Sequence, residues 1–571
     1  MRLQILKYVL VFLFMILFST IFWMQIIKGP EYFRQSESNR IRLVPEDASR
    51  GIIYDRNNIP LVANKLAFDV VAVPQEIKSE NKDELFRKLS KFLDIKDSIL
   101  AEAFERNFVS GFSPVMLAEN IPRNTAFLIE QEMSQLNGVF VKTSSIRNYL
   151  QGKASAHLVG YVGKMREYEY PEFKKYGYQM SDLIGRSGLE KEYDQILRGK
   201  PGGMQLEVDS EGSIIKVISY RPPVRGNDLH TTIDLNLQNL VSDLLADIKG
   251  AVCVIDPETG EVLALYSGPS YDPNIFINKD QYAAIGRVFK NPDAPLLNRA
   301  LNTYAPGSIF KIVTAYAGLW EKIIDSNTNF VCEGNFQLGN SSRSCWLKSG
   351  HGNVNLQKAL ETSCNVFFWE VSLKIGQRLL SGHAREFGFG KQTGIDLPSE
   401  PTGVVPDAHW KNVHIHEKWY AGDTANFAIG QGFLLASPIQ AVKMVSMVAN
   451  GGYEILPHIV KNENKTINIK KKILSEEILG VIRKGLNDVV SASAGTGRNA
   501  YVPGVAIFAK TGTAQSGKGL DPHAWFVGYA EFKNQKISFC VFEEFGGHGG
   551  EGPANIAKQI ILYFKAKEGG K

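Results

Sequence analysis

The chain has 571 residues, of which 44% are hydrophobic and 22% are charged, the composition of an ordinary globular protein with room for several domains. It has 64 Lys and Arg residues against 59 Asp and Glu residues, so the formal net charge is only +5 at pH 7. A charge this small over this length argues against nucleic acid as a partner.

The first predicted element is a membrane-spanning helix over residues 8–27, a run without a charge. At about 1.5 Å per residue, such a helix crosses a bilayer core of about 30 Å. A cleaved signal peptide is the less favoured alternative, because the run is longer than a usual signal region and no A-x-A-like site follows. Arg2 and Lys7 lie on the tail before it, residues 1–7, which the positive-inside tendency puts in the cytoplasm. We therefore expect a single-pass anchor with the rest of the chain outside the cytoplasm.

Residues 28–225 are predicted to form a mixed domain that ends in a linker. The stretch 49–64 contains an Asp-Arg-Asn-Asn turn between two apolar runs, which indicates two short strands. Helical patterns follow, at 82–93, 125–136 and 185–199. Two prolines in the segment 221–228 indicate a linker, and therefore a domain boundary near residue 225.

Residues 226–571 are predicted to form an α+β domain. Asp234 is placed to cap a helix with an apolar inner face, which Gly250 would close. The segment 251–268 has two β-rich runs around a Pro-Glu-Thr-Gly turn, which predicts a hairpin. Three more strands and a last helix are predicted at 504–515, 523–532, 536–545 and 554–564. Because the strands come from both ends of the domain, we predict an antiparallel sheet covered by helices from the long insert.

The first of three chemical motifs in this domain is S-x-x-K, formed by Ser308 and Lys311. The Pro-Gly pair before it predicts that the serine lies at a helix N-terminus, where free backbone N–H groups suit an oxyanion. The lysine lies three residues on and therefore over the same helix face. A lysine amine can act as the base for a serine if burial or a second cation lowers its pKa from about 10.4.

The other two motifs are Ser363-Cys364-Asn365, on a predicted helix, and Lys510-Thr511-Gly512-Thr513, on the predicted strand 504–515. Gly512 would let a ligand backbone lie close to this strand, and the threonines offer hydroxyl groups to a carboxylate. Each motif alone is weak evidence, since a helix cap or an ordinary strand explains it equally well. Their order and context together are a much stronger signal.

The three motifs resemble S-x-x-K, S-D-N and K-T-G, the signature of penicillin-binding proteins and class A β-lactamases. The chain resembles the class B penicillin-binding proteins, and among them the penicillin-binding protein 2 subgroup of elongation transpeptidases. Further landmarks of the resemblance lie at 50–58, 185–199, 254–265, 422–432 and 509–515. The segments 350–356 and 523–532 favour this subgroup less specifically. No glycosyltransferase domain precedes the linker, which argues against class A.

The resemblance implies a pedestal (dimerisation-type) domain at 28–225 and a penicillin-binding, serine β-lactamase-like transpeptidase domain at 226–571. The implied activity is peptidoglycan D,D-transpeptidation through a serine acyl-enzyme during cell elongation, with serine-type D-Ala-D-Ala carboxypeptidase activity in the same family. The implied location is the bacterial inner membrane, with the catalytic domain in the periplasm. The implied partners are peptidoglycan stem peptides, β-lactam antibiotics, other elongation-complex proteins and a SEDS-type glycosyltransferase (RodA) in the membrane.

The resemblance also assigns roles in the acyl transfer. Ser308 would attack the carbonyl of the penultimate D-Ala of a stem peptide, and Lys311 would take its proton. Ser363 would relay a proton to the leaving amine, while Asn365 would hold the amide of the donor. An amine from a neighbouring strand would then attack the acyl-enzyme and complete the cross-link.

The strand motif would bind the end of the donor peptide. Lys510 would supply positive potential, and Thr511 and Thr513, on either side of Gly512, would bind the terminal carboxylate. Backbone N–H groups of Ser308 and Thr513 would form the oxyanion hole, in which one donor is commonly worth about 3–4 kcal/mol.

Two other functions remain open at this point. A β-lactamase or membrane-bound β-lactam sensor would share Ser308 and Lys311, but it would have no use for the long N-terminal domain. A non-catalytic scaffold would keep the fold without its chemistry. The complete set of Ser308, Lys311, Ser363 and Lys510 argues against the scaffold.

Three of the five cysteines lie close in sequence to a histidine: Cys332, Cys345, His351 and Cys364. These side chains could hold a structural zinc with no open position, while catalysis needs no cofactor. Some relatives are understood to hold zinc here with a mixed Asp/His/Cys set, from which this sequence departs by having cysteines. A Cys332–Cys345 disulfide and free thiols are the alternatives. The remaining two cysteines, Cys253 and Cys540, lie in apolar runs and are predicted to be core residues.

Overall fold

The computed structural model describes residues 2–32, 41–77, 81–108, 114–132, 136–180, 182–208, 214–277, 281–461, 471–517 and 519–569. The chain forms two compact units. The N-terminal unit comprises Met1–Gly51, Asn64–Ile146 and Gln195–Asn227, and the C-terminal unit comprises Ile52–Ala63, Arg147–Asp194 and Asp228–Lys571. Each unit is made of three separate segments of the chain, so the units do not test a single domain boundary at residue 225. That boundary remains a prediction.

The predicted membrane-spanning helix is present as α1 (Arg2–Phe22), which continues into a π-helical segment, η1 (Trp23–Ile27). The span Gln4–Ile27 is long and apolar enough to cross a membrane, with a mean hydropathy of 2.4 over 18 residues, and its side chains are exposed. A signal sequence meets the same criteria. Retention of the helix on the mature chain therefore remains a prediction.

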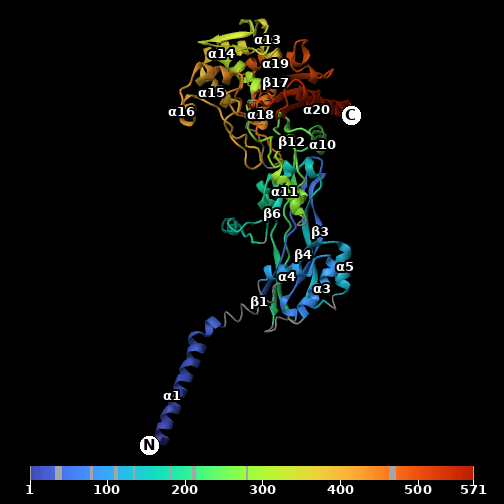
Figure 1. Ribbon diagram of the computed structural model, residues 1–571, viewed down its shortest axis with the longest axis vertical. Helices are drawn as coiled ribbons and strands as arrows, with labels where there is room; N and C mark the ends of the chain where they lie inside the picture. Colours follow the sequence, from blue (N-terminus) through green and yellow to red (C-terminus); the bar gives the residue numbers. More distant parts are fainter. Residues whose placement is uncertain are drawn as a thin grey trace. The chain divides into compact units, whose positions relative to one another are not determined.

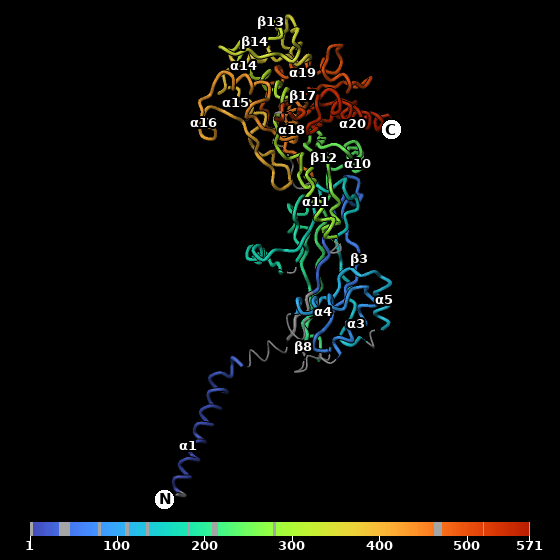
Figure 2. The backbone as a smooth tube through the Cα atoms, viewed as in Figure 1, coloured from blue at the N-terminus to red at the C-terminus, as the bar shows by residue number. Residues whose placement is uncertain are grey.

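The N-terminal unit contains a three-stranded antiparallel sheet in the order β1 (Ile41–Glu46), β8 (Gly202–Val208), β9 (Ile214–Arg221). A second group of strands joins β3 (Pro60–Ala72) to β4 (Val115–Ile121) and β5 (Val139–Tyr149). Three helices lie beside these strands (Figure 2): α3 (Lys82–Leu93), α4 (Asp97–Arg106) and α5 (Arg123–Gln131). The predicted helix 82–93 is thus confirmed, whereas residues 133–135 of the next one lie outside the described residues.

Short elements precede the main sheet in the C-terminal unit: β2 (Ile53–Tyr54), α6 (Ala156–Val159), β6 (Val162–Lys164), α7 (Tyr170–Phe173), β7 (Leu183–Gly185) and β10 (Leu229–His230). The single helix predicted over 185–199 is wrong, because the structure has two short helices, α8 (Gly188–Glu192) and α9 (Asp194–Leu197). The carboxylate of Asp194 accepts hydrogen bonds from Gly185 N and from the Tyr178 hydroxyl, which favours a break before α9.

A five-stranded antiparallel sheet forms the centre of the C-terminal unit (Figure 1), in the order β12 (Val262–Gly268), β11 (Gly250–Ile255), β19 (Lys536–Glu543), β18 (His523–Glu531), β17 (Ala506–Ala514). The predicted hairpin and the three C-terminal strands are therefore confirmed. Nearly every residue of β18 and β19 is buried, which shows that both faces of the sheet are covered. Cys253 and Cys540 lie opposite each other in this core, as predicted.

The helices of this unit are α10 (Leu235–Leu244), α11 (Tyr282–Lys290), α12 (Lys311–Trp320), α13 (Leu356–Glu361), α14 (Asn365–Ile375), α15 (Gln377–Glu386), α16 (Ala408–Ile415), α17 (Ala421–Ala428), α18 (Pro438–Ala449), α19 (Glu476–Ser491) and α20 (Gly552–Gly569). Of these, α10, α18, α19 and α20 pack against strands of the central sheet. Asp234 caps α10, since its carboxylate accepts from the N–H groups of Asn236 and Leu237. Gly250 does not close that helix as predicted: α10 ends at Leu244, and Gly250 begins β11.

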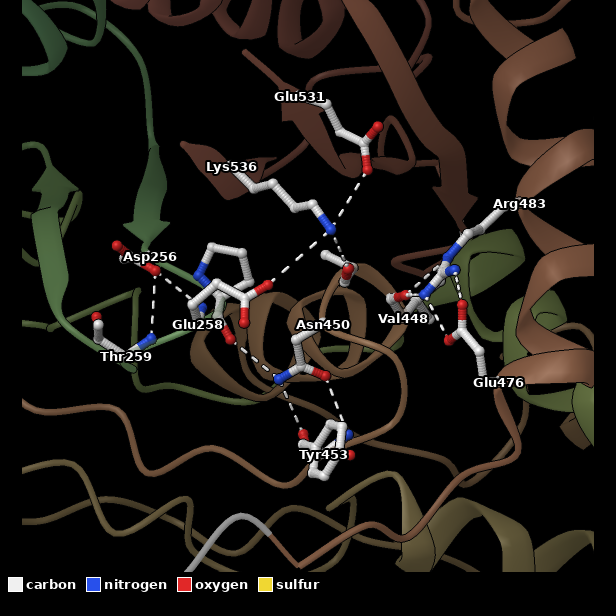
Figure 3. Close-up of polar contacts among 12 residues, drawn as sticks. Asp256, Glu258, Thr259, Val448, Asn450, Tyr453, Glu476, Arg483, Glu531 and Lys536 are labelled. Atoms are coloured by element: carbon white, nitrogen blue, oxygen red, sulfur yellow. Dashed lines mark hydrogen bonds and ion pairs between the residues drawn. The ribbon is translucent and has the colours of Figure 1, made fainter. Parts of the chain in front are cut away.

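The last backbone carbonyl groups of the buried helix α18 accept hydrogen bonds from side chains of two neighbouring elements (Figure 3). Arg483 on α19 donates to the carbonyl of Val448, and Lys536 on β19 donates to that of Ala449. Asn450 donates to the carbonyl of Pro257 in the β11–β12 turn. The last carbonyls of a helix need such partners when water cannot reach them, and cations there also match the helix dipole.

Four short strands lie between α12 and α13, and they form two small antiparallel pairs. One pair is β13 (Phe330–Cys332) with β16 (Gly352–Val354), and the other is β14 (Asn335–Leu338) with β15 (Ser341–Ser344). This segment contains three of the four predicted metal ligands.

Candidate active site

Ser308 lies in a 3₁₀ turn, η9 (Gly307–Phe310), which leads directly into α12. The prediction of a helix N-terminus is therefore refined: the serine precedes the α-helix by one turn. Gly307 has a φ of +60°, and a Cβ there would lie 2.7 Å from the carbonyl oxygen of Thr513. Its N–H donates to the carbonyl of Gly430 at 2.8 Å. The turn thus fits closely between β17 and the loop after α17, and Ser308 is half-buried there.

Lys311 is fully buried, and its amine contacts the second motif. Its Nζ donates to the carbonyl of Ser363 at 2.7 Å, to Ser363 Oγ at 3.1 Å and to Asn365 Oδ1 at 2.7 Å. Burial lowers the pKa of Lys311 to about 8, although the thiols of Cys364 and Cys345 act in the opposite direction. A substantial fraction of this amine is therefore neutral near pH 8, the state that a base requires.

The second motif is predicted on a helix, but Ser363 and Cys364 lie in the turn between α13 and α14, and only Asn365 is in a helix. Ser363 has a φ of +54°, a left-handed conformation that a non-glycine residue rarely adopts. Cys364 is the N-cap of α14, and Asn365 is the first residue of that helix. This turn explains why a thiol lies between the two polar residues: Ser363 and Asn365 face Lys311, while Cys364 joins a separate cluster.

Lys510 is the second buried cation of the site. Burial lowers its pKa well below the usual value, and the charge of Lys311 lowers it further. Its Nζ donates to the carbonyl of Thr511 at 3.1 Å. The two lysines therefore influence each other electrostatically, although they come from a helix and from a strand far apart in sequence.

β17 forms the edge of the central sheet, with β18 as its neighbour among the described strands. A Cβ on Gly512 would lie 2.9 Å from Ile309 Cγ2 and 3.0 Å from the carbonyl oxygen of Pro306. The close packing of the strand against the serine turn therefore leaves room only for a glycine at position 512. The predicted approach of a ligand backbone is a second reason for a glycine there. Thr513 is half-buried, so its side chain is accessible at the edge.

The three sequence motifs did not indicate several residues that the structure places at the site. Gln431 donates from Nε2 to the carbonyl of Thr513 at 3.3 Å, and Thr496 shares a hydrogen bond of 2.8 Å with the hydroxyl of Thr511. The indole of Trp346 is 57% exposed and donates to the carbonyl of Thr362 at 3.0 Å. Gln431 lies within the landmark 422–432, which could have indicated it, whereas Thr496 and Trp346 belong to no motif.

The four predicted metal ligands come together in the structure. The ligand atoms of Cys332, Cys345, His351 and Cys364 all lie within 4.8 Å of one another, and the three cysteines are buried. His351 Nδ1 lies 3.4 Å from Cys332 Sγ and 3.7 Å from Cys345 Sγ. All of these cysteines are free, so the alternative disulfide is not formed. Three sulfurs and one imidazole nitrogen form a donor set that suits a closed zinc site.

Two family models match the chain. The penicillin binding protein transpeptidase domain matches residues 250–562, and the penicillin-binding protein dimerisation domain matches residues 45–231. The peptidoglycan D,D-transpeptidase MrdA of Haemophilus influenzae is 32% identical over 96% of this chain and 89% of its own length. The protein of the same name from Escherichia coli is 32% identical over 96% and 91% of the two chains.

Solved structures agree with these matches. Penicillin-binding protein 2 of Helicobacter pylori, solved in a complex with MreC, has a TM-score of 0.82 and 28% identity over 92% of this chain and 99% of that chain. Penicillin-binding protein 2 of Pseudomonas aeruginosa has a TM-score of 0.70 and 27% identity over 92% and 96% of the two chains. The likeness therefore covers both the fold and nearly the whole length.

Proposed function

The chain belongs to the penicillin-binding protein family of transpeptidases, and we propose how its own residues perform the reaction. It is a peptidoglycan D,D-transpeptidase that cross-links stem peptides during cell elongation, and it is a target of β-lactams. The observation that carries the mechanism is the buried amine of Lys311, held by Ser363 and Asn365 with its pKa lowered to about 8.

In the acylation step Ser308 Oγ attacks the carbonyl carbon of the penultimate D-Ala, and its proton passes to the neutral amine of Lys311. The tetrahedral intermediate then collapses, the peptide bond breaks, and D-Ala leaves with a proton on its nitrogen. Ser363 relays that proton from Lys311, which is supported by its hydroxyl lying 3.1 Å from the lysine Nζ. A general base of this kind commonly contributes about 10²–10⁴-fold to the rate.

The same residues act in reverse in the second step. An amine of a neighbouring stem peptide attacks the acyl-enzyme carbonyl, and Lys311 receives the amine proton. The ester bond to Ser308 then breaks to leave a new peptide bond, and Lys311 gives the proton to Ser308 Oγ, which restores the free serine and the neutral amine. Water in place of the amine would give D-Ala-D-Ala carboxypeptidase activity.

Substrate binding is assigned to the edge strand β17. Lys510 favours the negatively charged peptide terminus, and Thr511 and Thr513 offer hydroxyl groups to its carboxylate, with Gly512 between them. Backbone N–H groups of Ser308 and Thr513 stabilise the oxyanion. The close approach of Gly307 to Thr513, with a Cβ position only 2.7 Å from its carbonyl oxygen, supports this pairing of the turn with the strand.

Labelling with a fluorescent penicillin tests the assignment of the nucleophile. Wild-type protein should form a persistent covalent adduct that maps to Ser308, and Ser308→Ala should form none while keeping its fold by circular dichroism. Rapid turnover of a chromogenic β-lactam by the wild type would instead indicate a β-lactamase or a sensor. Normal growth of a depletion strain that carries Ser308→Ala would indicate a scaffold.

We also propose that Cys332, Cys345, His351 and Cys364 hold a structural zinc. Zinc would supply four bonds that join the β13–β16 segment to the start of α14, and no step of catalysis passes through it. This would fix Ser363 and Asn365 on either side of Cys364. Elemental analysis of protein purified without added metal should give about one zinc per chain, and much less zinc together with a Cys332–Cys345 disulfide would refute the site.

The relatives of the chain support a proposal for its location and partners. We infer an inner-membrane anchor at the N-terminus and a periplasmic catalytic domain. Partners would include elongation proteins, as supported by the complex of the Helicobacter pylori relative with MreC, and a SEDS-type glycosyltransferase (RodA) in the membrane. Co-purification of full-length protein with RodA after mild detergent extraction tests the membrane partner.

A further inference from the structure

The glycine-rich loop 544–551, which joins β19 to α20, packs directly against the proposed substrate strand. A Cβ on Gly549 would lie 2.6 Å from the carbonyl oxygen of Gly512. A Cβ on Gly550 would be 3.7 Å from Cγ2 of Thr511. The loop backbone therefore contacts β17 at the residues that are proposed to bind the donor peptide. A movement of the loop would remove packing contacts from that part of the strand.

The side chain of Glu543 lies at the base of this loop, beside Gly546 within the loop and Gly552 just after it. A Cβ on Gly546 would lie 2.6 Å from Glu543 Oε2, and a Cβ on Gly552 would lie 2.6 Å from Oε1. Glu543 is the last residue of β19 and Gly552 is the first residue of α20, so one carboxyl group links the strand, the loop and the helix. The side chain is only 7% exposed.

Among the residues that the structure describes, no lysine or arginine forms an ion pair with this carboxyl group. Its Oε1 is buried without a hydrogen-bond partner. The charged and titratable groups on the surrounding elements are Lys249 before β11, His523 on β18, Glu544, His548 and Glu551 in the loop, and Lys558 on α20. Lys249 pairs with Asp293, and Glu544 pairs with Arg299. Burial alone raises the pKa of Glu543 to about 7.

We propose that Glu543 is a positioning residue that, when protonated, holds the loop 544–551 against β17 and, when ionised, releases it. A neutral carboxyl group is tolerated in a closed, apolar position, whereas an unpaired carboxylate there is strongly disfavoured. The glycines of the loop let it move and admit water to the charge. The proposal rests on the proposed function, because it concerns the strand that binds the donor peptide.

The test is the pH profile of acylation by a fluorescent penicillin, measured between pH 5.5 and 9 on full-length protein. The wild-type rate should rise as Lys311 loses its proton and fall as Glu543 ionises. Glu543→Gln should keep the rise and lose the fall, so that it exceeds the wild type by about tenfold at pH 8. Glu551→Gln makes the same chemical change at an exposed position of the same loop and should follow the wild type.

Superimposable profiles for Glu543→Gln and the wild type would overturn the proposal. Failure of the wild type to be acylated at any pH would count against the proposed function instead. A second measurement does not depend on a variant: hydrogen exchange of the loop 544–551 in the wild type, corrected for the intrinsic effect of pH. Protection should decrease as pH rises through 7, and constant protection would contradict the release of the loop.

Discussion

At the scale of the residue, Lys311 is the side chain whose chemistry depends most on its surroundings. It is 0% exposed, and its three hydrogen bonds all end on the second motif. The same buried position that lowers its pKa therefore also holds its amine against Ser363 and Asn365.

We predict that Lys311→Ala slows acylation by penicillin by about 10²–10⁴-fold, because the serine loses its base. The variant should still fold, although the loss of a fully buried side chain should make it less stable than the wild type. The second-order acylation rate constant measures the effect, with circular dichroism as the check on the fold. A folded variant that acylates at nearly the wild-type rate would remove Lys311 from the mechanism.

The carboxyl group of Glu543 makes a prediction about stability. Its pKa is about 7 in the folded chain, above the usual value of 4.5, so the native state binds an extra proton between these pH values. Stability contributed by this proton is present below pH 4.5 and is lost as pH rises through 7.

Glu543→Gln should therefore stabilise the chain at pH 8 and change it little at pH 4.5. The gain is expected to be about 1–3 kcal/mol, because one pKa unit corresponds to about 1.4 kcal/mol and protein relaxation reduces the effect. Thermal melting of both proteins at the two pH values measures it. An equal effect at both pH values would show that ionisation of Glu543 is not the cause.

At the scale of the element, the site depends on the close packing of the η9 turn against β17. Gly307 in the turn faces the backbone of Thr513, and Gly512 in the strand faces Ile309 and the carbonyl of Pro306, so neither position has room for a side chain. Strand and turn together therefore bring the turn that carries Ser308 against Gly512 and Thr513 of β17.

Gly512→Ala should destabilise the chain by about 1–3 kcal/mol, the usual cost of overpacking. Its new methyl group would lie 2.9 Å from both Ile309 Cγ2 and Trp525 Cβ, and it would displace the serine turn. Denaturant unfolding and the acylation rate should both respond. Gly519→Ala is a suitable control, since no atom lies within 4 Å of a Cβ there, although its φ of +81° adds some strain. Unchanged stability and acylation in Gly512→Ala would contradict this view of the packing.

At the scale of the whole molecule, the long apolar helix near the N-terminus is a candidate membrane span. Gln4–Ile27 carries Lys7 near its start and otherwise has no charged side chain. A helix of this length and hydropathy is stable across a bilayer because all of its backbone groups are bonded internally.

We predict that this helix stays on the mature protein and keeps it in the membrane fraction after a carbonate wash. Intact mass and N-terminal sequencing of the purified protein measure the outcome. A variant that lacks residues 1–27 provides the control and should move to the soluble fraction. A mature N-terminus beyond Ile27 would show that the segment is a cleaved signal.

The sequence by itself determined the sheet and the chemical motifs. Alternating apolar runs and the Pro-Glu-Thr-Gly turn predicted β11, β12 and the three C-terminal strands, because these signals depend on a few neighbouring residues. The residue types and order of the motifs likewise indicated Ser308, Lys311 and Lys510. The cysteine and histidine spacing predicted a four-ligand cluster, which the structure brings together.

Only the tertiary structure decided how these residues act. The left-handed conformation of Ser363, the burial that lowers the pKa of Lys311 and the burial that raises the pKa of Glu543 appear only in the folded structure. Thr496 carries no local signal either, and it joins the site only because its loop packs beside Thr511. Helices and strands can be predicted from a short stretch because their patterns follow the backbone periodicity. The burial of a side chain and its pKa depend on all the groups that surround it in the folded chain, and a short stretch of sequence does not identify those groups.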